Sequence, residues 1–270
     1  MTRFGFLALT MTLAAPLAAQ DRIPSHCRSL AESTDGVEYL WQAGLTAPLP
    51  DDTARIHFID HAMFVVEAGD ISAVTDFSGY LGDTLWAPDV VTMNQAHTSH
   101  FTNIIPDGVS HVLPGWGRYG EGITHDLDLG AMRIRNVSTD IRMGDGREKN
   151  GNSVFIFEAA GLCIGHLGHL HHELSEEQYA AIGRLDVVMA PVDGGYTVPR
   201  DTMVAIVQRL RSSIVIPMHW FSRQGLEIFL SQMENDFAVV DTQSPDLLVS
   251  LDRLPSMPTI MVLEPAFLRE

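Results

Sequence analysis

The amino-acid sequence predicts an α/β domain, and three observations lead to this prediction. Short runs of β-branched and aromatic residues fill residues 55–76, where Gly and Asp separate them. After residue 175, helical apolar periodicity alternates with short apolar strands. The chain has 270 residues, of which 46% are hydrophobic and 19% charged, and no low-complexity linker divides it. One contiguous domain is therefore a simpler interpretation than two small ones.

The first residues, MTRFGFLALTMTLAAPLAAQ, form a segment of a different kind. Arg3 precedes an apolar run over residues 4–13, and small residues follow around Ala18. This order is typical of a secretory signal peptide. The run is shorter than the ~20 residues that a membrane span needs, and a retained anchor is the alternative. We expect residues 1–20 to be cleaved, which leaves one domain over residues 21–270 that is periplasmic or secreted and has no membrane span.

Strand-like patterns occupy most of the first half of the chain and recur in the second. The predicted strands are RIHFID, AMFVVEAG and ISAVTD within residues 55–76, DVVTM at 89–93, AMRIRNVS at 131–138, two strands joined at Ala160-Gly161 within 153–168, DVVMAPV at 186–192, and SIVIPMH at 213–219.

Helical signals occur only in the second half. Ser175 and Gln178 have the spacing of a capping box, which predicts a helix that ends near Gly183. A second helix is predicted over residues 199–211, because its apolar residues recur at helical spacing: Met203, Ile206, Val207 and Leu210. A third is predicted over residues 224–234. Strands that alternate with helices in this way are typical of layered α/β folds.

The charge balance excludes one class of partner. The formal net charge is −17 at pH 7. Such a surface repels phosphate backbones, so we expect no nucleic acid partner. The charge says little about a small-molecule substrate or ligand, which is the partner that we expect on other grounds. Nothing in the sequence predicts the oligomeric state.

The two cysteines, Cys27 and Cys163, leave two alternatives open. A disulfide is compatible with an exported chain. Cys163 lies in the apolar run GLCIGHL, however, where a buried thiol is equally typical.

Three predicted strands end in polar loops that carry histidine, namely His97, His169 and His219. Ligands collect where strand ends open into loops in layered α/β folds, so these histidines are expected to converge.

At these residues the chain resembles the metallo-β-lactamase superfamily, in particular its branch of metal-dependent hydrolases similar to ascorbate-6-phosphate lactonases. The motifs that carry the resemblance lie within residues 55–225 and are FIDHAMFVVEAGDISAVTDF, GLCIGHLGHLHHELSEEQ, APVDGGYTV and IVIPMHW. The resemblance implies a four-layer αββα sandwich with a metal site at one edge of the sheets.

The resemblance also implies metal ligands, residue by residue. Where the family has His-x-His-x-Asp-His, this chain has Gln95-Ala96-His97-Thr98-Ser99-His100. The first family site would consist of Gln95, His97, Thr139 and His169, and is interpreted as broken. The second would consist of Ser99, His100, His169 and His219, and keeps three imidazoles. A single zinc ion per chain on His100, His169 and His219, with an open fourth position, is chemically sound.

Other roles follow from the same comparison. His97 and Ser99 are assigned to catalysis, His97 as a proton relay or substrate contact and Ser99 at the edge of the metal cluster. Gln95 and Thr139 are expected to line the vacated first site, Asp76 to orient a ligand histidine, and Tyr196 to border the site. His61 is interpreted as a core residue in preference to a site residue, and His171 as a surface residue. His166 and His172 occupy positions where relatives often have histidine.

Two functions remain open at this point. The first is an exported single-metal hydrolase that cleaves an ester, lactone or phosphoester with a metal-activated water. The second is a non-catalytic member of the fold that binds a metal, a small ligand or a protein partner. Converging histidines beside an open pocket would favour the first function, and splayed histidines or a filled pocket the second.

Overall fold

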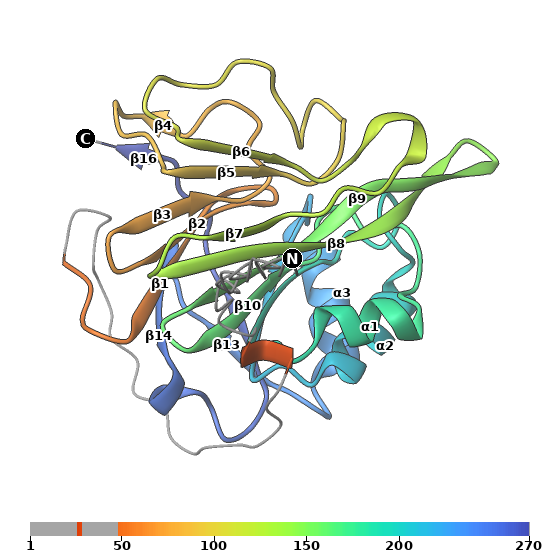
Figure 1. Ribbon diagram of the computed structural model, residues 1–270. Helices are drawn as coiled ribbons and strands as arrows, with labels where there is room; N and C mark the ends of the chain where they lie inside the picture. The colour runs from red at the N-terminus through yellow and green to blue at the C-terminus, as the bar shows by residue number, and fades with distance from the viewer. Residues whose placement is uncertain (1–25, 29–47, 270) are drawn as a thin grey trace, which may run out of the picture.

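The structure, a computed structural model, describes residues 26–28 and 48–269 and consists of two β-sheets packed face to face. The predicted signal peptide and its cleavage position lie outside the described residues. Figure 1 shows the strands of both sheets, with the helices α1, α2 and α3 gathered on one side of the molecule. None of the described helices is both long and apolar enough to cross a membrane.

The first sheet has six strands in the order β14-β1-β2-β3-β5-β6. Its strands are β1 (Thr53–Asp60), β2 (Met63–Ala68), β3 (Ile71–Val74), β5 (Val90–Met93), β6 (His111–Pro114) and β14 (Asp246–Ser250). Strands β1, β2 and β3 form an antiparallel meander, whereas β5 and β6 join it in parallel. Almost every residue of β1 is buried, because both faces of this sheet are covered.

The second sheet has eight strands in the order β13-β15-β12-β11-β10-β9-β8-β7. Its strands are β7 (Asp126–Asp128), β8 (Met132–Met143), β9 (Gly146–Ala159), β10 (Leu162–His166), β11 (Val187–Pro191), β12 (Ile214–Met218), β13 (Ala238–Asp241) and β15 (Thr259–Val262). Strands β10, β11 and β12 run parallel, so their carboxyl ends meet at one edge. The long β8–β9 hairpin extends beyond the sandwich (Figure 1). A small third sheet pairs β4 (Gly82–Asp83) with β16 (Leu268–Arg269).

The main core fills the space between the two large sheets. Phe58 and Phe64 stack with ring centroids 4.4 Å apart, and they pack with Phe155, Phe157 and Ile216 of the second sheet. All five side chains are at most 1% exposed. Successive residues of a strand face opposite sides of its sheet. The apolar residues that face the core therefore fix the register of both sheets.

Three helices cover the outer face of the eight-stranded sheet: α1 (Glu176–Ile182), α2 (Arg200–Leu210) and α3 (Arg223–Met233). Their apolar stripes, which include Met203, Ile206 and Phe229, pack on this sheet in a second core. The predicted capping box is present, since the side chain of Ser175 accepts from the amide of Gln178 and the reciprocal bond forms as well.

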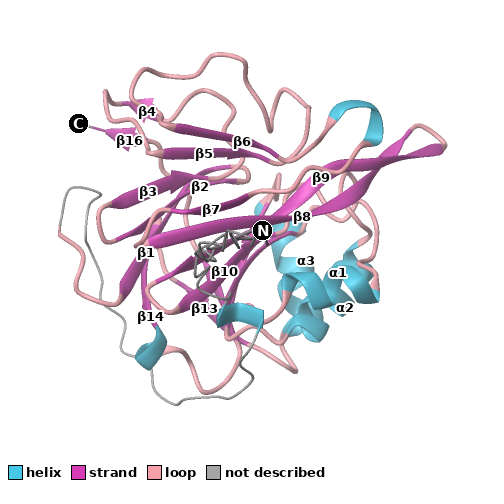
Figure 2. Ribbon diagram, in the orientation of Figure 1, coloured by secondary structure: helices cyan, strands magenta, loops and turns pink. Residues whose placement is uncertain are grey.

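The outer face of the six-stranded sheet is covered by loops instead of helices within the described residues (Figure 2). Phe77, Phe101 and Trp116 come from these loops and pack on Val65 and Val91 of the sheet. The α/β sandwich is thus confirmed, while its fourth layer is irregular. The connections here contain Gly79, Gly82 and several prolines, which do not sustain a helix.

A disulfide joins Cys27 to Cys163 across a sequence separation of 136 residues. This bond decides between the two alternatives that the sequence left open. It attaches the short 3₁₀ turn His26–Arg28 (η1) to strand β10, whose chain continues into the histidine-rich loop. Two further 3₁₀ turns are η2 (Arg118–Gly120), which lies in the glycine-rich segment GWGRYGEG at residues 115–122, and η3 (Leu251–Arg253).

Candidate metal centre

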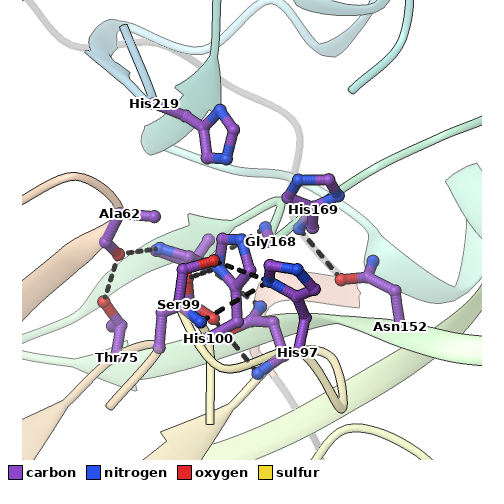
Figure 3. A network of polar contacts seen from close by, with 12 residues as sticks. Ala62, Thr75, His97, Ser99, His100, Asn152, Gly168, His169 and His219 are labelled. Carbon is purple, nitrogen blue, oxygen red and sulfur yellow. Dashed lines mark hydrogen bonds and ion pairs between the residues drawn. The ribbon is translucent and has the colours of Figure 1, made fainter. Parts of the chain in front are cut away.

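Four chain segments converge at one end of the two sheets. The turn between β1 and β2 carries His61, the segment after β5 carries His97 and His100, the segment after β10 carries His169, and His219 follows β12 directly. Figure 3 shows His97, Ser99 and His100 on one segment, with His169 and His219 on neighbouring segments that face it.

Three of these histidines form a compact group. The side chains of His61, His100 and His219 each offer one nitrogen, and these nitrogens all lie within 4.8 Å of one another. The backbone supports the group, because the amide of His219 donates to the carbonyl of His61 at 2.7 Å. The ligand set predicted from the sequence differs from this group in one member, with His169 in place of His61.

Buried carboxylates orient two members of the group. The Nδ1–H of His100 donates to Asp76, and both side chains are 1% exposed. A carboxylate only accepts, so Nδ1 of His100 carries a proton and Nε2 is the nitrogen that can offer a lone pair. That Nε2 is buried and has no hydrogen-bond partner among the described residues. Burying a lone pair away from water without a partner costs free energy. It is nevertheless the state that a metal ligand requires.

His219 has the same arrangement. Its Nδ1–H donates to Asp193 Oδ1 at 3.0 Å, and both side chains are at most 2% exposed. Asp193 also accepts from the hydroxyl of Thr197 at 2.6 Å and from the amides of Gly195 and Tyr196. Burial alone would raise the pKa of Asp193, but the hydrogen bonds from His219 and Thr197 outweigh it and hold this pKa well below its usual range. Asp193 is therefore ionised and keeps His219 in a fixed orientation.

The third member, His61, is neutral at physiological pH. Burial, together with the neighbouring His219 and His100, lowers the pKa of His61 to about 4. Its ring lies 4.0 Å from that of His219 and 5.3 Å from that of His100, between centroids.

Three imidazoles and two nearby carboxylates fit one divalent cation. Zinc–nitrogen bonds of about 2.0–2.1 Å would place tetrahedral ligand nitrogens roughly 3.3 Å apart, so the group is somewhat wider than a closed zinc site. The donors do not suit two ions, because the described residues provide no carboxylate in a bridging position between the histidines.

His169 lies beside the group without belonging to it. Its ring centroid is 4.6 Å from that of His100 and 4.8 Å from that of His219. Its Nδ1 contacts His171 Nε2 at 2.7 Å, and His171 Nδ1 accepts from the amide of Arg142 at 2.6 Å. Burial is the largest cause that lowers the pKa of His169 to about 2 and that of His171 to about 4, so both rings are neutral.

A pocket of about 540 Å³ opens over these histidines. It is lined by His61, Gln95, His97, Ser99, Arg142, His169, His171, Gly195, Tyr196, His219 and Phe221. A second pocket of about 470 Å³ adjoins it and shares three of these residues, namely His61, Ser99 and Phe221. A larger pocket of about 580 Å³ lies between Pro50 and Arg253, but its lining contains no histidine, so we place the function at the histidine-lined pocket.

The remaining predicted site residues lie at the rim or below it. His97 Nδ1 and Ser99 Oγ are 2.8 Å apart, and both residues are exposed. Gln95 lines the pocket and has a buried Oε1 without a partner among the described residues. Tyr196 is exposed at the rim, with its ring 5.4 Å from that of Phe221.

Thr139 does not line the pocket, although the sequence led us to expect it there. It is 2% exposed, and its hydroxyl accepts from Asn152 Nδ2 at 2.7 Å. The Oδ1 of Asn152 in turn accepts from the amide of His169, so Thr139 supports the His169 segment from within the protein. His166 is also buried, where it donates from Nε2 to the carbonyl of Ala62 at 2.7 Å.

Sequence reasoning missed four residues of this site: His61, Arg142, His171 and Asp193. A signal existed for Asp193, which is a carboxylate two residues after a buried strand. His61, in the short turn between β1 and β2, was weighed both as a site residue and as a core residue, and the preference for the core role was wrong. Arg142 and His171 come together only through the long β8–β9 hairpin, and no local pattern encodes that contact.

Comparisons with known proteins bear on these residues. A family model described as a β-lactamase superfamily domain matches residues 55–219. A UPF0173 metal-dependent hydrolase of Alkaliphilus metalliredigens is 22% identical over 192 residues, which cover 62% of this chain and 85% of that relative.

Solved structures agree in fold. A candidate Zn-dependent hydrolase of the metallo-β-lactamase superfamily from Thermotoga maritima matches with a TM-score of 0.55 and 24% identity, covering 78% of this chain and 98% of that one. A candidate metal-dependent hydrolase from Parabacteroides distasonis matches with a TM-score of 0.53 and 14% identity, covering 67% and 89% respectively.

Proposed function

From the premise that the chain belongs to the metallo-β-lactamase superfamily, we propose that it is an exported, single-metal hydrolase of an ester, lactone or phosphoester. One observation carries the proposal. His61, His100 and His219 bring their nitrogens within 4.8 Å of one another at the floor of an open pocket. Buried carboxylates fix two of these rings, which is the usual support of a metal-binding histidine.

These three histidines would hold the metal, and zinc is the ion that we propose. When bound, a divalent ion supplies Lewis acidity and a water molecule acidified toward neutral pH. The net reaction is hydrolysis, in which the oxygen of water bonds to the carbonyl carbon or phosphorus. The bond to the leaving oxygen breaks, and that oxygen takes up a proton of the water. The exposed His97, in contact with Ser99, is placed at the rim to receive and pass on such a proton.

The pocket also suggests which substrates fit. Arg142 is the one Lys or Arg among the described residues that line it. Its Nη2 is held by the carbonyls of Gly195 and Tyr196 at 3.0 and 2.9 Å. Tyr196 and Phe221 add exposed aromatic surface at the rim. We therefore propose a substrate with an anionic group and an apolar part, which span the two adjoining pockets.

The non-catalytic alternative has less support. A scaffold that has lost its activity would have splayed histidines or a filled pocket. Here the histidines converge, and about 540 Å³ of open space lies above them.

The test combines metal analysis with an activity panel. The purified chain, freed of loosely bound ions, should contain one metal per chain by elemental analysis. It should hydrolyse at least one member of a panel of esters, lactones and phosphodiesters with and without a carboxylate. His219→Ala should abolish both metal binding and activity. His111→Ala, on strand β6 away from the pocket, should change neither.

Two tightly held metals per chain, or metal retention in the His219→Ala variant, would show that the ligand set is wrong. A metal-loaded chain that cleaves no member of the panel would favour the non-catalytic alternative.

Export is proposed on the residue pattern of residues 1–20 and is supported by the Cys27–Cys163 disulfide, which persists in oxidising compartments. Cell fractionation with N-terminal sequencing should find a periplasmic or secreted chain that starts near Gln20 or Asp21. A cytosolic chain that retains Met1 would contradict this part of the proposal.

A further inference from the structure

We propose that His169 is a hydrogen-bond donor to the substrate, with its proton held on Nε2 by His171, and is not a metal ligand. This inference rests on the proposed hydrolase function for its catalytic consequence, but not for its structural part. It follows from two consecutive hydrogen bonds that determine where each imidazole proton lies.

The first hydrogen bond fixes the tautomer of His171. The backbone amide of Arg142 lies 2.6 Å from His171 Nδ1. An amide N–H can only donate, so Nδ1 must be the acceptor and carries no proton. Neutral His171 therefore carries its proton on Nε2. Arg142 is paired with Arg147 in the β8–β9 hairpin, and this pairing holds the backbone donor in place.

The second hydrogen bond passes the constraint to His169. His171 Nε2 lies 2.7 Å from His169 Nδ1, so the Nε2–H of His171 donates and His169 Nδ1 accepts. If His169 Nδ1 also carried a proton, its N–H would point at the Nε2–H of His171, and no hydrogen bond could form. The proton of His169 therefore lies on Nε2. Its two hydrogen bonds within the described residues are made by the backbone amide and by Nδ1, so Nε2 is left for a substrate.

Neighbouring histidines thus have opposite tautomers. His100 and His219 donate from Nδ1 to carboxylates and keep a bare Nε2 for a metal. His169 accepts at Nδ1 and presents an Nε2–H, which cannot bind a metal without losing its proton. The tautomers differ because the rings have different partners. His100 and His219 each face a carboxylate, whereas His169 faces the N–H of another imidazole, that of His171.

The place of His169 suits a donor to a reacting oxygen. It lines the pocket together with His61 and His219, and its ring is 4.8 Å from the ring of His219. When water adds to a carbonyl or phosphoryl group, negative charge grows on the oxygen that the group already carries. A neutral imidazole N–H can stabilise that charge by donation alone. No bond of His169 forms or breaks, and its proton stays on Nε2.

The backbone under His169 is fixed for this purpose. Its amide donates to Asn152 Oδ1 at 2.9 Å. The preceding Gly168 has φ +62°, and a Cβ there would lie 2.4 Å from the Asn94 side chain and 2.6 Å from Asn152 Oδ1. Glycine lets the loop pass between these two asparagines, so the backbone position of His169 is set by the scaffold.

The direct test is the tautomer itself. The ¹⁵N and ¹³C chemical shifts of the imidazoles should be recorded by NMR on the full, metal-free chain with labelled histidine. The His169 signals are identified by their loss in His169→Gln. They should show a single Nε2–H tautomer, which should give way to a mixture in His171→Ala. An Nδ1–H tautomer for His169 in the unsubstituted chain would overturn the proposal.

Metal content provides the second test. His169→Gln and His169→Ala should retain one metal per chain with affinity within a few-fold, whereas His61→Ala should lose it. The loss of metal from both His169 variants, with retention in His61→Ala, would overturn the assignment and restore the ligand set predicted from the sequence.

The activity of the His169 variants tests the proposed donor role in catalysis. Removal of one donor to a developing oxyanion typically lowers kcat by about 10²–10³-fold, and His169→Ala should fall in that range with its metal in place. Gln places an amide N–H near the position of Nε2, so His169→Gln should recover part of this loss. Equal kcat values in the unsubstituted chain and His169→Ala would contradict the donor role. If the unsubstituted chain cleaves no substrate, the proposed function fails, while NMR and metal content still decide the tautomer and the ligand set.

Discussion

Three residues of the metal centre have backbone conformations that side chains rarely adopt. His61, Asp76 and His219 have φ values of 52°, 52° and 57°. The left-handed region costs residues other than glycine roughly 1–2 kcal/mol each, so sequences avoid it unless the surroundings enforce it. Here each residue follows or ends a buried strand, and the turn directs its side chain toward the same point. The folded scaffold thus maintains local strain in order to aim two imidazoles and the carboxylate that orients a third.

A substitution at Asp76 tests whether this carboxylate orients His100 for metal binding. Asp76→Asn keeps the size of the side chain and an oxygen acceptor, but it loses the negative charge that holds the Nδ1–H of His100. Loss of such a supporting carboxylate typically lowers metal affinity about 10–100-fold. Competition with a chelating dye measures this change. Asp145→Asn, on the exposed tip of the β8–β9 hairpin, is the matched control and should bind metal like the unsubstituted chain. An unchanged affinity for Asp76→Asn would remove Asp76 from the ligand support.

The depressed pKa of His61 predicts a pH dependence of stability. Burial lowers this pKa to about 4 from an ordinary value of 6.5, so between these two pH values the unfolded chain binds a proton that the folded chain does not. The contribution is fully present above pH 6.5 and is lost as the pH falls toward 4. Urea unfolding of the metal-free chain from pH 7.5 to 5 should therefore show a steeper loss of unfolding free energy than the His61→Gln variant shows. Identical pH profiles for the two chains would mean that His61 is not buried as a neutral ring.

At the scale of single elements, the cap of helix α1 can be tested by stability. The side chain of Ser175 accepts from the amide of Gln178, and loss of an N-cap costs about 1 kcal/mol. Ser175→Ala should lower the unfolding free energy by that amount in urea titration. Ser110→Ala, at an exposed serine outside any helix, should leave it within error. A Ser175→Ala chain as stable as the control would show that the cap contributes nothing.

Elements with local signals could be predicted from the sequence, and those without could not. The capping box and the apolar spacing placed α1 and α2 to within a residue of their observed ends. Strands β13, β14 and β15 were not predicted. They lie at or next to sheet edges, with mixed burial in β13 and β14, so no clean alternation marks them. Their place is decided by pairing with distant strands, as in β14 against β1, and pairing is not a local property.

The residues of the site divide in the same way, into those that a local sequence signal predicts and those that it does not. His100, His169 and His219 follow strands that the sequence predicts, and their rings lie together, with centroids 4.6, 5.4 and 4.8 Å apart. Which of them can bind a metal depends on the partner of each Nδ1, and those partners come from elsewhere in the chain. Asp76 lies 24 residues before His100, and Asp193 lies 26 residues before His219. Such pairings set the chemistry of a ring, and they appear only once the chain is folded.

For the whole molecule, the disulfide predicts a large stability difference between oxidised and reduced protein. It closes a loop with a sequence separation of 136 residues, and a native bond of this kind contributes about 2–5 kcal/mol. Guanidinium unfolding with and without a reductant should show a difference of that size. The Cys27→Ala/Cys163→Ala double variant should match the reduced chain and be insensitive to reductant. Equal stability of the oxidised and reduced chains would show that η1 adds little to the fold.

The same disulfide also determines what oxidative folding of the chain requires. With two cysteines in 270 residues only one pairing within a molecule exists, whereas four cysteines already allow three pairings. Scrambled monomers therefore cannot form, and oxidative folding needs an oxidant but no isomerase. The one remaining error is a cross-link between two molecules. Because Cys27 is synthesised 136 residues ahead of its partner, it can meet a thiol of another copy before Cys163 exists, so we expect the yield of correctly joined monomer to fall as the chains become more crowded during synthesis.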